Sequence, residues 1–171
     1  MNIVKAKYEN LDVIMDIYKS AREFMKRNGN GTQWGDNHPP RRMIEEDIAK
    51  GRSYICIEDA KIIGVFAFII GAEPTYHEIE NGNWHFNEIY GTIHRIASDE
   101  KARGITKACF DFCCEQCSYL RIDTHKNNKP MQNAIKRYGF QECGIIHIED
   151  GSERIAFDFK KKQDIQRKPA D

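Results

Sequence analysis

The sequence has 171 residues, with 26 basic and 26 acidic side chains and a formal net charge of zero. This balance excludes a protein whose overall field attracts nucleic acid or an anionic membrane surface. The length suits one domain with its own core, which we expect at residues 1–160, followed by a charged, frayed tail at 161–171. Because there is no signal-peptide pattern and the longest apolar stretch, Val65–Ile70, is too short to span a bilayer, a cytoplasmic protein is expected.

The first half of the chain predicts three strands and two helices. Apolar periodicity and turn residues place a strand at 3–7, a helix from Asn10 to about Asn28, a loop to Pro40, a helix at 41–50, and strands at 53–58 and 61–70 that Asp59-Ala60 joins as a hairpin. Trp34 lies in the Gly-rich loop, where it either plugs the edge of the core or lines a pocket.

The second half begins with a loose aromatic segment at 71–86, whose composition suits a pocket wall. It continues with a strand at 88–98, a turn, a helix from about Ile105, a strand at 119–124, a helix that Asn128 caps and Gly139 ends, and a strand pair at 140–147 and 154–159. This order predicts an α/β (α+β) fold with a mixed sheet covered by helices.

Six cysteines raise the question of a metal site or a disulfide framework. Four fall on one predicted helix and two in strand-like segments, namely Cys109, Cys113, Cys114 and Cys117, then Cys56 and Cys143. No histidine or second cysteine pair stands at zinc-finger spacing, so we expect reduced buried thiols and no metal. A thiol redox sensor is the weaker hypothesis, because a cysteine near a helix C-terminus meets the negative end of the dipole.

The join between strand and helix at Ser98–Thr106 is the strongest functional signal. A helix N-terminus after a tight turn leaves several backbone N–H groups without intrahelical partners, at the positive end of the helix dipole. Apolar residues at Ile105, Ala108, Cys109 and Phe112 support the helix, and Gly104 lies in its first turn. The join therefore predicts a phosphate-binding site.

Two motifs give the chain its resemblance to a known family. Lys101-Ala-Arg-Gly104-Ile-Thr106 is similar to the pyrophosphate loop of the GNAT superfamily of N-acetyltransferases, and Asn128 precedes Gly139-Phe140 at that family's spacing. The element order over residues 1–160 also resembles this family. The resemblance implies a mostly antiparallel sheet that splays between its fourth and fifth strands.

The resemblance also implies acetyl-coenzyme A as cosubstrate, with its pyrophosphate on Lys101–Thr106 and its pantetheine along the strand at 94–98. The residues implied to bind it are Ile96, Ala97, Ser98, Lys101, Ala102, Arg103, Gly104, Ile105, Thr106 and Asn128. Lys101 stands where the family has Gln or Arg, and Thr106 where it has Gly or Ala. Binding is therefore expected to depend mainly on backbone donors.

The catalytic residues are less well marked. Many relatives place a tyrosine four residues before the Gly-Phe pair to protonate the thiolate, and this chain has Ile135 there. Tyr138 is a candidate, although its position on the apolar stripe also suits the core. The other candidates for proton transfer are Glu88, Tyr90, His94 and His125. His94 also suits a packing role, and His125 an exposed loop.

Trp34, Tyr76 and Trp84 are expected to line the acceptor pocket, with Glu73, Glu78 and Glu80 available to an amine. The resulting prediction is an N-acetyltransferase for a small-molecule amine or a peptide terminus, acting by direct transfer as a monomer or homodimer, without nucleic acid or membrane partners. The alternative is a non-catalytic acyl-coenzyme A-binding or sensor module.

Overall fold

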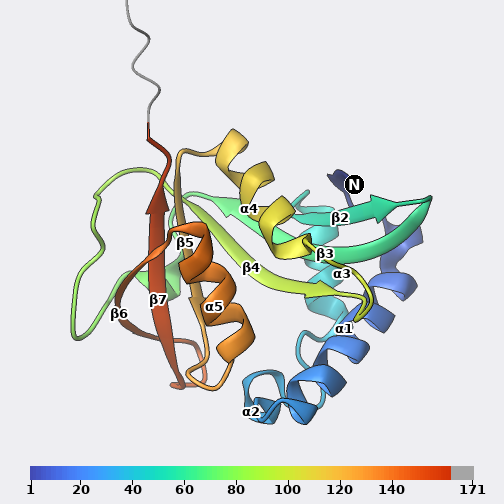
Figure 1. Ribbon diagram of the computed structural model, residues 1–171, viewed down its shortest axis with the longest axis horizontal. Coiled ribbons are helices and arrows are strands. Elements are labelled where there is room, and N and C mark those ends of the chain that lie inside the picture. The colour runs from blue at the N-terminus through green and yellow to red at the C-terminus, as the bar shows by residue number, and fades with distance from the viewer. Residues whose placement is uncertain (163–171) are drawn as a thin grey trace, which may run out of the picture.

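The computed structural model describes residues 1–162 (Figure 1), so most of the expected tail at 161–171 lies outside the described residues. The strands are β1 Asn2–Lys5, β2 Ser53–Glu58, β3 Lys61–Ile70, β4 Gly91–Ser98, β5 Tyr119–Thr124, β6 Gln141–His147 and β7 Glu153–Lys160. The helices are α1 Leu11–Arg27, α2 Gly31–Trp34, α3 Arg41–Ala49, α4 Ile105–Gln116 and α5 Lys129–Tyr138, with short 3-10 turns at Tyr8–Asn10 and Pro74–Tyr76.

The seven strands form a mixed sheet in the order β1-β2-β3-β4-β5-β7-β6. Among the strands of residues 1–162, only β4 and β5 pair in parallel, joined by a crossover through α4, and the other neighbours are antiparallel. This arrangement confirms the predicted fold class of a mostly antiparallel sheet flanked by helices.

The sheet is split between β4 and β5. Their parallel pairing involves only Gly91, Thr92 and Ile93 on β4, and beyond Ile93 the two strands diverge (Figure 1). The predicted splay is therefore confirmed, and the edge of β4 from His94 to Ser98 has no strand partner on the β5 side. Backbone groups along such an edge are free to bind an extended ligand.

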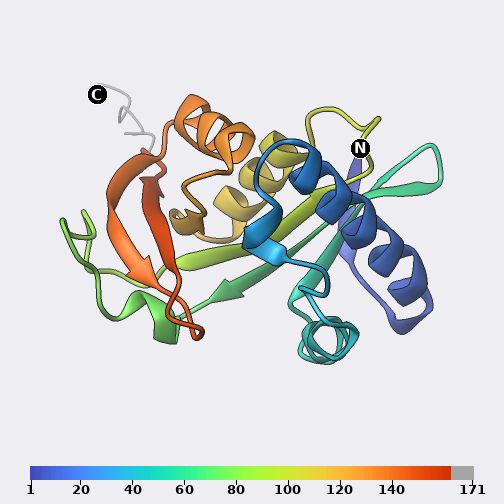
Figure 2. The same cartoon turned by 90° about the horizontal axis from the view of Figure 1, so that it is seen from below.

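Helices cover both faces of the sheet (Figures 1 and 2). One buried cluster joins α4 and α5 to the sheet, with Phe110, Cys113 and Ile135 at its centre. A second cluster lies on the opposite face, where Ile14 of α1 and Ile44 of α3 pack against the strands. Five of the six cysteines are buried, as the sequence predicts for thiols that act as small apolar side chains.

The segment 71–90 covers the sheet at β5, β7 and β6, on the face that also carries α1 and α3. Tyr76 and the partly buried Trp84 pack there against Ile146 and Ala156, and Glu80 forms an isolated antiparallel bridge with Ile145. The segment lies so close to β6 that a Cβ atom on Gly82 would stand 1.9 Å from the carbonyl oxygen of Cys143. The segment predicted to form a pocket wall is thus packed tightly against β6 and β7.

Several predicted boundaries change in the structure. The loop expected at 28–40 contains the short helix α2, because Trp34 is drawn into the core against Tyr18. Strand β4 begins at Gly91 instead of Glu88. At Gly91 the chain bends onto β3 so closely that a Cβ atom on this residue would stand 2.4 Å from the Phe68 ring. Cys117 follows α4 instead of lying within it.

Other local predictions are confirmed. Asp59 and Ala60 join β2 and β3 with φ angles of 49° and 59°, the conformation of a tight hairpin turn. The Asn128 side chain accepts a hydrogen bond from the N–H of Met131 and so caps α5. No helix within residues 1–162 has both the length and the apolar character needed to cross a membrane.

Candidate active site

A cavity of about 530 Å³ lies at the N-terminus of α4, between α4 and α5. It is lined by Ser98, Ala102, Arg103, Gly104, Ile105, Thr106, Lys107, Phe110, Ala134, Arg137 and Tyr138. Arg103, Lys107 and Arg137 bring positive charge to it, in addition to the positive end of the helix dipole. The cavity therefore has the electrostatic character of an anion site.

The backbone at this helix start supplies free donors. Gly104 precedes α4 with φ +76°, a left-handed conformation that favours glycine. Within the described part of the chain, the N–H groups from Arg103 to Lys107 donate to no protein acceptor. Consecutive unpaired N–H groups at a helix N-terminus fit a diphosphate, so these residues fit the phosphate groups of coenzyme A.

The donors lie slightly further along the chain than the predicted loop. The N–H of Lys101 donates to Asp99 Oδ1 at 3.0 Å, and the N–H of Ala102 donates to the Asp99 carbonyl oxygen at 3.0 Å. These two donors are therefore used within the turn, and the exposed Lys101 does not line the cavity. The free N–H donors therefore belong to Arg103–Lys107, which we call the N–H cradle.

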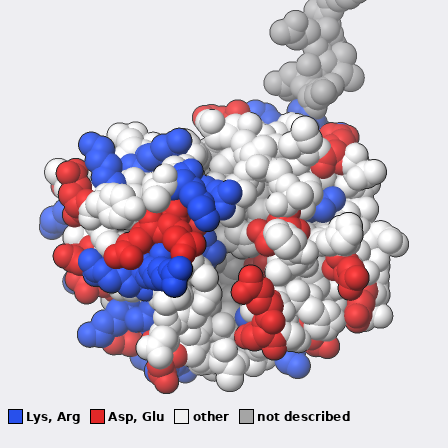
Figure 3. All heavy atoms as spheres, turned by 180° about the vertical axis from the view of Figure 1, so that it is seen from behind, with Lys and Arg blue, Asp and Glu red and all other residues white. Residues whose placement is uncertain are grey.

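A larger cavity of about 690 Å³ lies at the other end of the unpaired stretch of β4. It opens on the face that carries α1 and α3, and Figure 3 shows this face hollowed between the half with α1 and α3 and the half with β6 and β7. Its walls include Gln33 and Trp34 from α2, Ile93–Ile96 from β4, Ile122–Thr124 from β5, and Arg154 from β7.

A β-bulge shapes this cavity on the β4 side. Arg95 and Ile96 together face the single residue Phe66 of β3, and Arg95 has φ +54°, which is uncommon for a residue other than glycine. The Tyr18 hydroxyl donates to the Arg95 carbonyl oxygen at 3.1 Å, and the Arg95 guanidinium forms an ion pair with Asp47. Helices α1 and α3 thus hold the bulge in its strained conformation.

A histidine and a carboxylate meet on the cavity wall. His94 Nε2 lies 3.0 Å from Glu73 Oε2, and both side chains are largely buried. Burial alone would raise the pKa of Glu73, but hydrogen bonds from His94 and Thr75 outweigh it and hold this pKa below its usual value. Glu73 is therefore ionised at neutral pH and can orient the imidazole.

The chain is similar over most of its length to a GNAT-family acetyltransferase from Streptococcus agalactiae, a protein of known crystal structure. The two sequences are 31% identical, the match covers 95% of this chain and 96% of that chain, and the TM-score is 0.86. This chain belongs to the GNAT family of acetyltransferases. Its reaction class is therefore acetyl transfer, with acetyl-coenzyme A as the cosubstrate.

More distant structures share the GNAT fold. A GNAT-family acetyltransferase from Bacillus cereus is 22% identical, with coverage of 95% of this chain and 98% of that chain and a TM-score of 0.61. A phosphinothricin acetyltransferase from Sinorhizobium meliloti in complex with AcCoA is 13% identical, with coverage of 99% and 92% and a TM-score of 0.64. No protein-family model matches the sequence, and the comparison with curated proteins gives no match.

The structure separates the proton-transfer candidates of this GNAT protein. His94 lines the larger cavity, whereas Glu88 precedes β4 and forms an ion pair with Lys160. Tyr90 lies behind the cavity wall, where its hydroxyl accepts a hydrogen bond from the N–H of Glu73 at 2.9 Å. His125 follows β5 and does not line the cavity, and burial together with Arg154 lowers its pKa.

Tyr138 lines the smaller cavity, far along α5 from the β4–β5 split. Its hydroxyl donates to Asp111 Oδ1 at 3.0 Å, and its ring packs among Phe110, Phe140 and Phe159. Burial raises the pKa of this hydroxyl. These contacts fix Tyr138 in the wall of the smaller cavity.

The aromatic residues predicted for the acceptor pocket lie in two layers. Trp34 lines the larger cavity and also packs edge-on against Tyr18, so it serves both the pocket and the core. Tyr76 is buried one layer behind, with its hydroxyl donating to Asp123 Oδ2 at 2.7 Å. Trp84 stacks on Tyr76 and on the Arg121 guanidinium, outside the cavity lining.

The remaining predicted cofactor residues also differ in position. Ile96 and Asn128 line the larger cavity, Ser98 lines the smaller one, and Ala97 is buried against α1. Of the acidic residues considered for an amine, only Glu73 lines the larger cavity, because Glu80 is fixed by its bridge to β6 and Glu78 is exposed.

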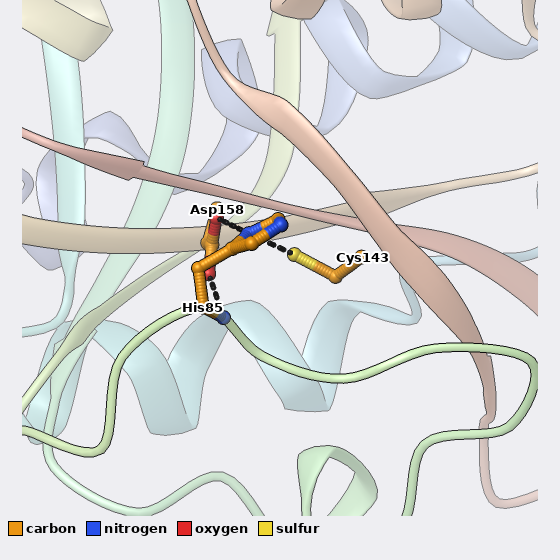
Figure 4. Close-up of side chains that lie close together, drawn as sticks. All are labelled: His85, Cys143 and Asp158. Atoms are coloured by element: carbon orange, nitrogen blue, oxygen red, sulfur yellow. Dashed lines mark hydrogen bonds and ion pairs between the residues drawn. The ribbon is translucent and has the colours of Figure 1, made fainter.

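A separate polar cluster lies between the 71–90 segment and the end of the sheet (Figure 4). Asp158 accepts hydrogen bonds from His85 Nδ1 at 2.7 Å, from the N–H of His85 at 2.9 Å and from the Tyr119 hydroxyl at 2.8 Å. Cys143 Sγ lies 3.4 Å from His85 Nδ1. Imidazole nitrogen, thiol sulfur and carboxylate oxygen also ligate metal ions, but the Asp158 oxygens already accept these three hydrogen bonds. The cluster therefore anchors the 71–90 segment.

Sequence reasoning missed several residues of the two cavities. Arg137 of α5 and Lys107 of α4 line the smaller cavity, and Arg95, Asp47 and Arg154 line the larger one. An arginine in a strand carries no local signal that its backbone forms a bulge. Only the pairing register of β3 and β4 shows it.

Proposed function

We propose that this GNAT protein is an N-acetyltransferase that moves the acetyl group of acetyl-coenzyme A directly to a primary amine, either of a small molecule or of a peptide terminus. The amine acceptor binds in the larger cavity, and the coenzyme binds through the smaller one. The expectation of a monomer or homodimer is kept as part of this proposal.

One observation carries the proposal, namely that the two cavities lie at the two ends of the unpaired stretch of β4. Ser98 lines the cavity beside the free N–H groups of α4, and His94 lines the cavity that opens on the opposite face. An extended cosubstrate lying along this strand edge connects an anion site to a proton-handling group. A protein that only binds a ligand in one cavity does not require a second cavity at the other end of the same strand edge.

The residues of the larger cavity supply what amide formation needs. The coenzyme provides an activated thioester, whereas the acceptor amine must lose a proton before it can react. His94 has an imidazole suited to accept that proton, and the Glu73 carboxylate fixes the ring through the 3.0 Å contact and stabilises the imidazolium. Trp34 closes part of the wall and limits the access of water.

A specific observation favours the alternative of a non-catalytic acyl-coenzyme A sensor. The position at which many relatives carry a tyrosine is Ile135, which is fully buried in the core. Tyr138 does not replace it in this structure, because its hydroxyl is bonded to Asp111. A sensor needs the coenzyme cavity but no group that protonates the leaving thiolate.

Two measurements separate these functions. Acetyl-coenzyme A should raise the melting temperature of the protein, and free thiol should appear when a panel of primary amines is added. The absence of any thermal shift at millimolar cosubstrate would overturn both functions. A clear thermal shift without thiol release above the hydrolysis background, for any amine of the panel, would support the sensor instead.

A further inference from the structure

Several side chains on the wall of the larger cavity have a partner close by. The Arg95 guanidinium pairs with Asp47, His94 Nε2 lies 3.0 Å from the Glu73 carboxylate, and the exposed Lys50 ammonium lies 3.8 Å from the Glu46 carboxylate. Such pairs compensate the cost of removing charge from water. A buried charge in the cavity without this compensation therefore points to a ligand.

Arg154 of β7 is such a charge. Only 6% of the residue is exposed, and it lines the larger cavity. Its Nη1 atom donates to Ser152 Oγ and to the Glu153 carbonyl oxygen, both at 2.9 Å, and Nη2 lies 3.5 Å from the Gln33 carbonyl oxygen. All three acceptors are neutral, and within residues 1–162 no carboxylate oxygen lies within 4.0 Å of the guanidinium.

The neighbours of Arg154 do not neutralise it. Asp150, in the turn before β7, is exposed, and its carboxylate accepts a hydrogen bond from the N–H of Ser152 at 2.9 Å. Burial, together with the positive charges of Arg95 and Arg154, lowers the pKa of His38 to about 4, so this ring is neutral at physiological pH. Hydrogen bonds from Ser152 and, less strongly, the charge of Arg154 lower the pKa of Asp150, but no carboxylate of the described residues contacts the guanidinium. Its unused N–H donors therefore remain available to an anionic group.

The position of Arg154 relates it to the proton-handling pair. His94 lies on β4 and Arg154 on β7, so the two side chains reach the cavity from opposite sides of the split in the sheet. The buried Thr124 hydroxyl, which lines the same cavity on β5, also has no hydrogen-bond partner in the described structure. The cavity thus offers a cation and a free hydroxyl across from the histidine.

We propose that Arg154 binds a carboxylate of the acceptor, so that the preferred acceptors carry an amine and a carboxylate, as amino acids do. The inference rests on the proposed N-acetyltransferase function and specifies its substrate class. A guanidinium with unused N–H donors matches the two oxygens of a carboxylate. A single guanidinium with Glu149 and Asp150 at the same cavity suits this monoanion better than a phosphate dianion.

The first test uses the unmodified protein and sets of three matched acceptors, each consisting of an amino acid, its amide and the corresponding decarboxylated amine. We expect the amino acid to have a kcat/KM about 10-fold to 100-fold higher than its two partners, the range of one charge-assisted contact. Equal or higher values for the amides and amines would overturn the inference and leave the N-acetyltransferase function standing.

If no acceptor turns over, the same triplets are compared by their effect on the melting temperature in the presence of coenzyme A. Stabilisation by the amino acid alone supports the carboxylate site although the transferase function has failed. Equal stabilisation by all three compounds, or none by any of them, overturns it. The two proposals therefore fail by different results.

The second test changes the arginine. Arg154→Gln should raise KM for the amino acid about tenfold or more with little change in kcat, because the contact is made equally in the ground state and the transition state. The constants for the decarboxylated amine should stay unchanged, and Arg154→Lys should recover part of the loss. Lys19→Gln, on the exposed side of α1, removes one positive charge elsewhere and serves as the control.

A structural role of Arg154 gives a different pattern. If the guanidinium only fastens α2 through Gln33, Arg154→Gln raises KM for acids and amines alike and lowers the melting temperature. That result would overturn the inference. If the variant does not fold, the unmodified protein and Arg154→Lys still decide the question through the matched acceptors.

Discussion

The imidazole of His94 and the carboxylate of Glu73 lie 3.0 Å apart, on segments 21 residues apart in the chain. The contact joins the start of β4 to the turn that follows β3, and both residues face the larger cavity. His94 is thereby held in one orientation beside the split in the sheet. This relationship makes His94 the first residue to test.

Replacing His94 by Gln should lower kcat for amine acetylation about 10²-fold to 10⁴-fold, the usual contribution of a positioned general base. Glu73→Gln should have a smaller effect, because Gln still accepts a hydrogen bond from the ring but does not stabilise its charged form. The thermal shift caused by acetyl-coenzyme A should persist in both variants, since the coenzyme donors lie at α4. The rate of thiol release at saturating amine measures the change in kcat.

His77→Gln is the matched control for this experiment, because His77 is exposed in the same segment and makes no side-chain contact with the cavity wall in the described structure. It should retain full activity. A His94→Gln protein that retains full kcat over the whole pH range would remove His94 from the mechanism and leave only its packing role.

The N–H cradle at Arg103–Lys107 gives a second prediction. Gly104→Asp should abolish the thermal shift by acetyl-coenzyme A, because a carboxylate at the start of α4 repels the phosphates beside the free N–H groups. The substitution also forces a side chain into φ +76°, which should cost about 1 kcal/mol of stability. Differential scanning fluorimetry with and without the cosubstrate measures both effects.

Gly29→Asp separates these two effects. Gly29 has φ +75°, and a Cβ atom there meets no other atom within 4 Å, as at Gly104. It follows α1, outside both cavity linings. Both variants should lose stability through the strained φ, and Gly29→Asp should lose more, because its carboxylate stands at the negative end of the α1 dipole. Only Gly104→Asp should lose the response to acetyl-coenzyme A. Loss of the response in both would mean that it reports backbone strain and not binding.

The sequence predicted those parts of the fold that depend on local pattern. The hairpin at Asp59-Ala60, the cap at Asn128 and the helix start at Gly104 each have a local physical signature, and the structure has all three. The split in the sheet came from the resemblance to the family, because no pattern within β4 or β5 marks where the pairing of two strands ends.

The larger cavity was predicted only in outline. The aromatic 71–86 segment was expected to line it, but Tyr76 and Trp84 turn instead toward the sheet, where the Arg121 guanidinium lies 4.1 Å from the centre of the Trp84 ring. Glu73 reaches the cavity because a 3-10 turn follows it. These outcomes depend on tertiary packing, which composition does not encode.

His38 makes the stability of the protein dependent on pH. Burial, together with the charges of Arg95 and Arg154, lowers its pKa to about 4, whereas the ring in the unfolded chain titrates near its ordinary value of about 6.5. Between these values the unfolded state binds the extra proton, so the free energy of unfolding should fall as the pH drops from about 6.5 to 4. For a partly exposed ring we expect a loss of about 1–2 kcal/mol.

Urea denaturation at a series of pH values measures this loss. His38→Gln should flatten the curve between pH about 6.5 and 4, because the glutamine takes up no proton. The same substitution at the exposed His77 should leave the slope unchanged. An unaltered slope in His38→Gln would show that other groups carry the pH dependence.

The anchor formed by His85 and Asp158 gives the last prediction. His85→Ala removes one of the three hydrogen bonds of the buried Asp158 carboxylate, and we expect it to cost about 1–2 kcal/mol in urea denaturation. His147→Ala is the control, since this histidine is exposed and its only ionic contact, at 3.9 Å from Glu80, is weak, so its cost should stay within about 0.5 kcal/mol.

Thiol labelling tests whether the same contact holds the 71–90 segment in place. Burial and the charge of Asp158 raise the pKa of Cys143 to about 12, so its thiol should react slowly with iodoacetamide at neutral pH in the native protein. His85→Ala should accelerate labelling of Cys143 without changing that of Cys56, which lies on β2, far from the segment. Equal acceleration at both cysteines would indicate global destabilisation, and no acceleration would mean that the packing of Gly82 against β6 holds the segment without the histidine.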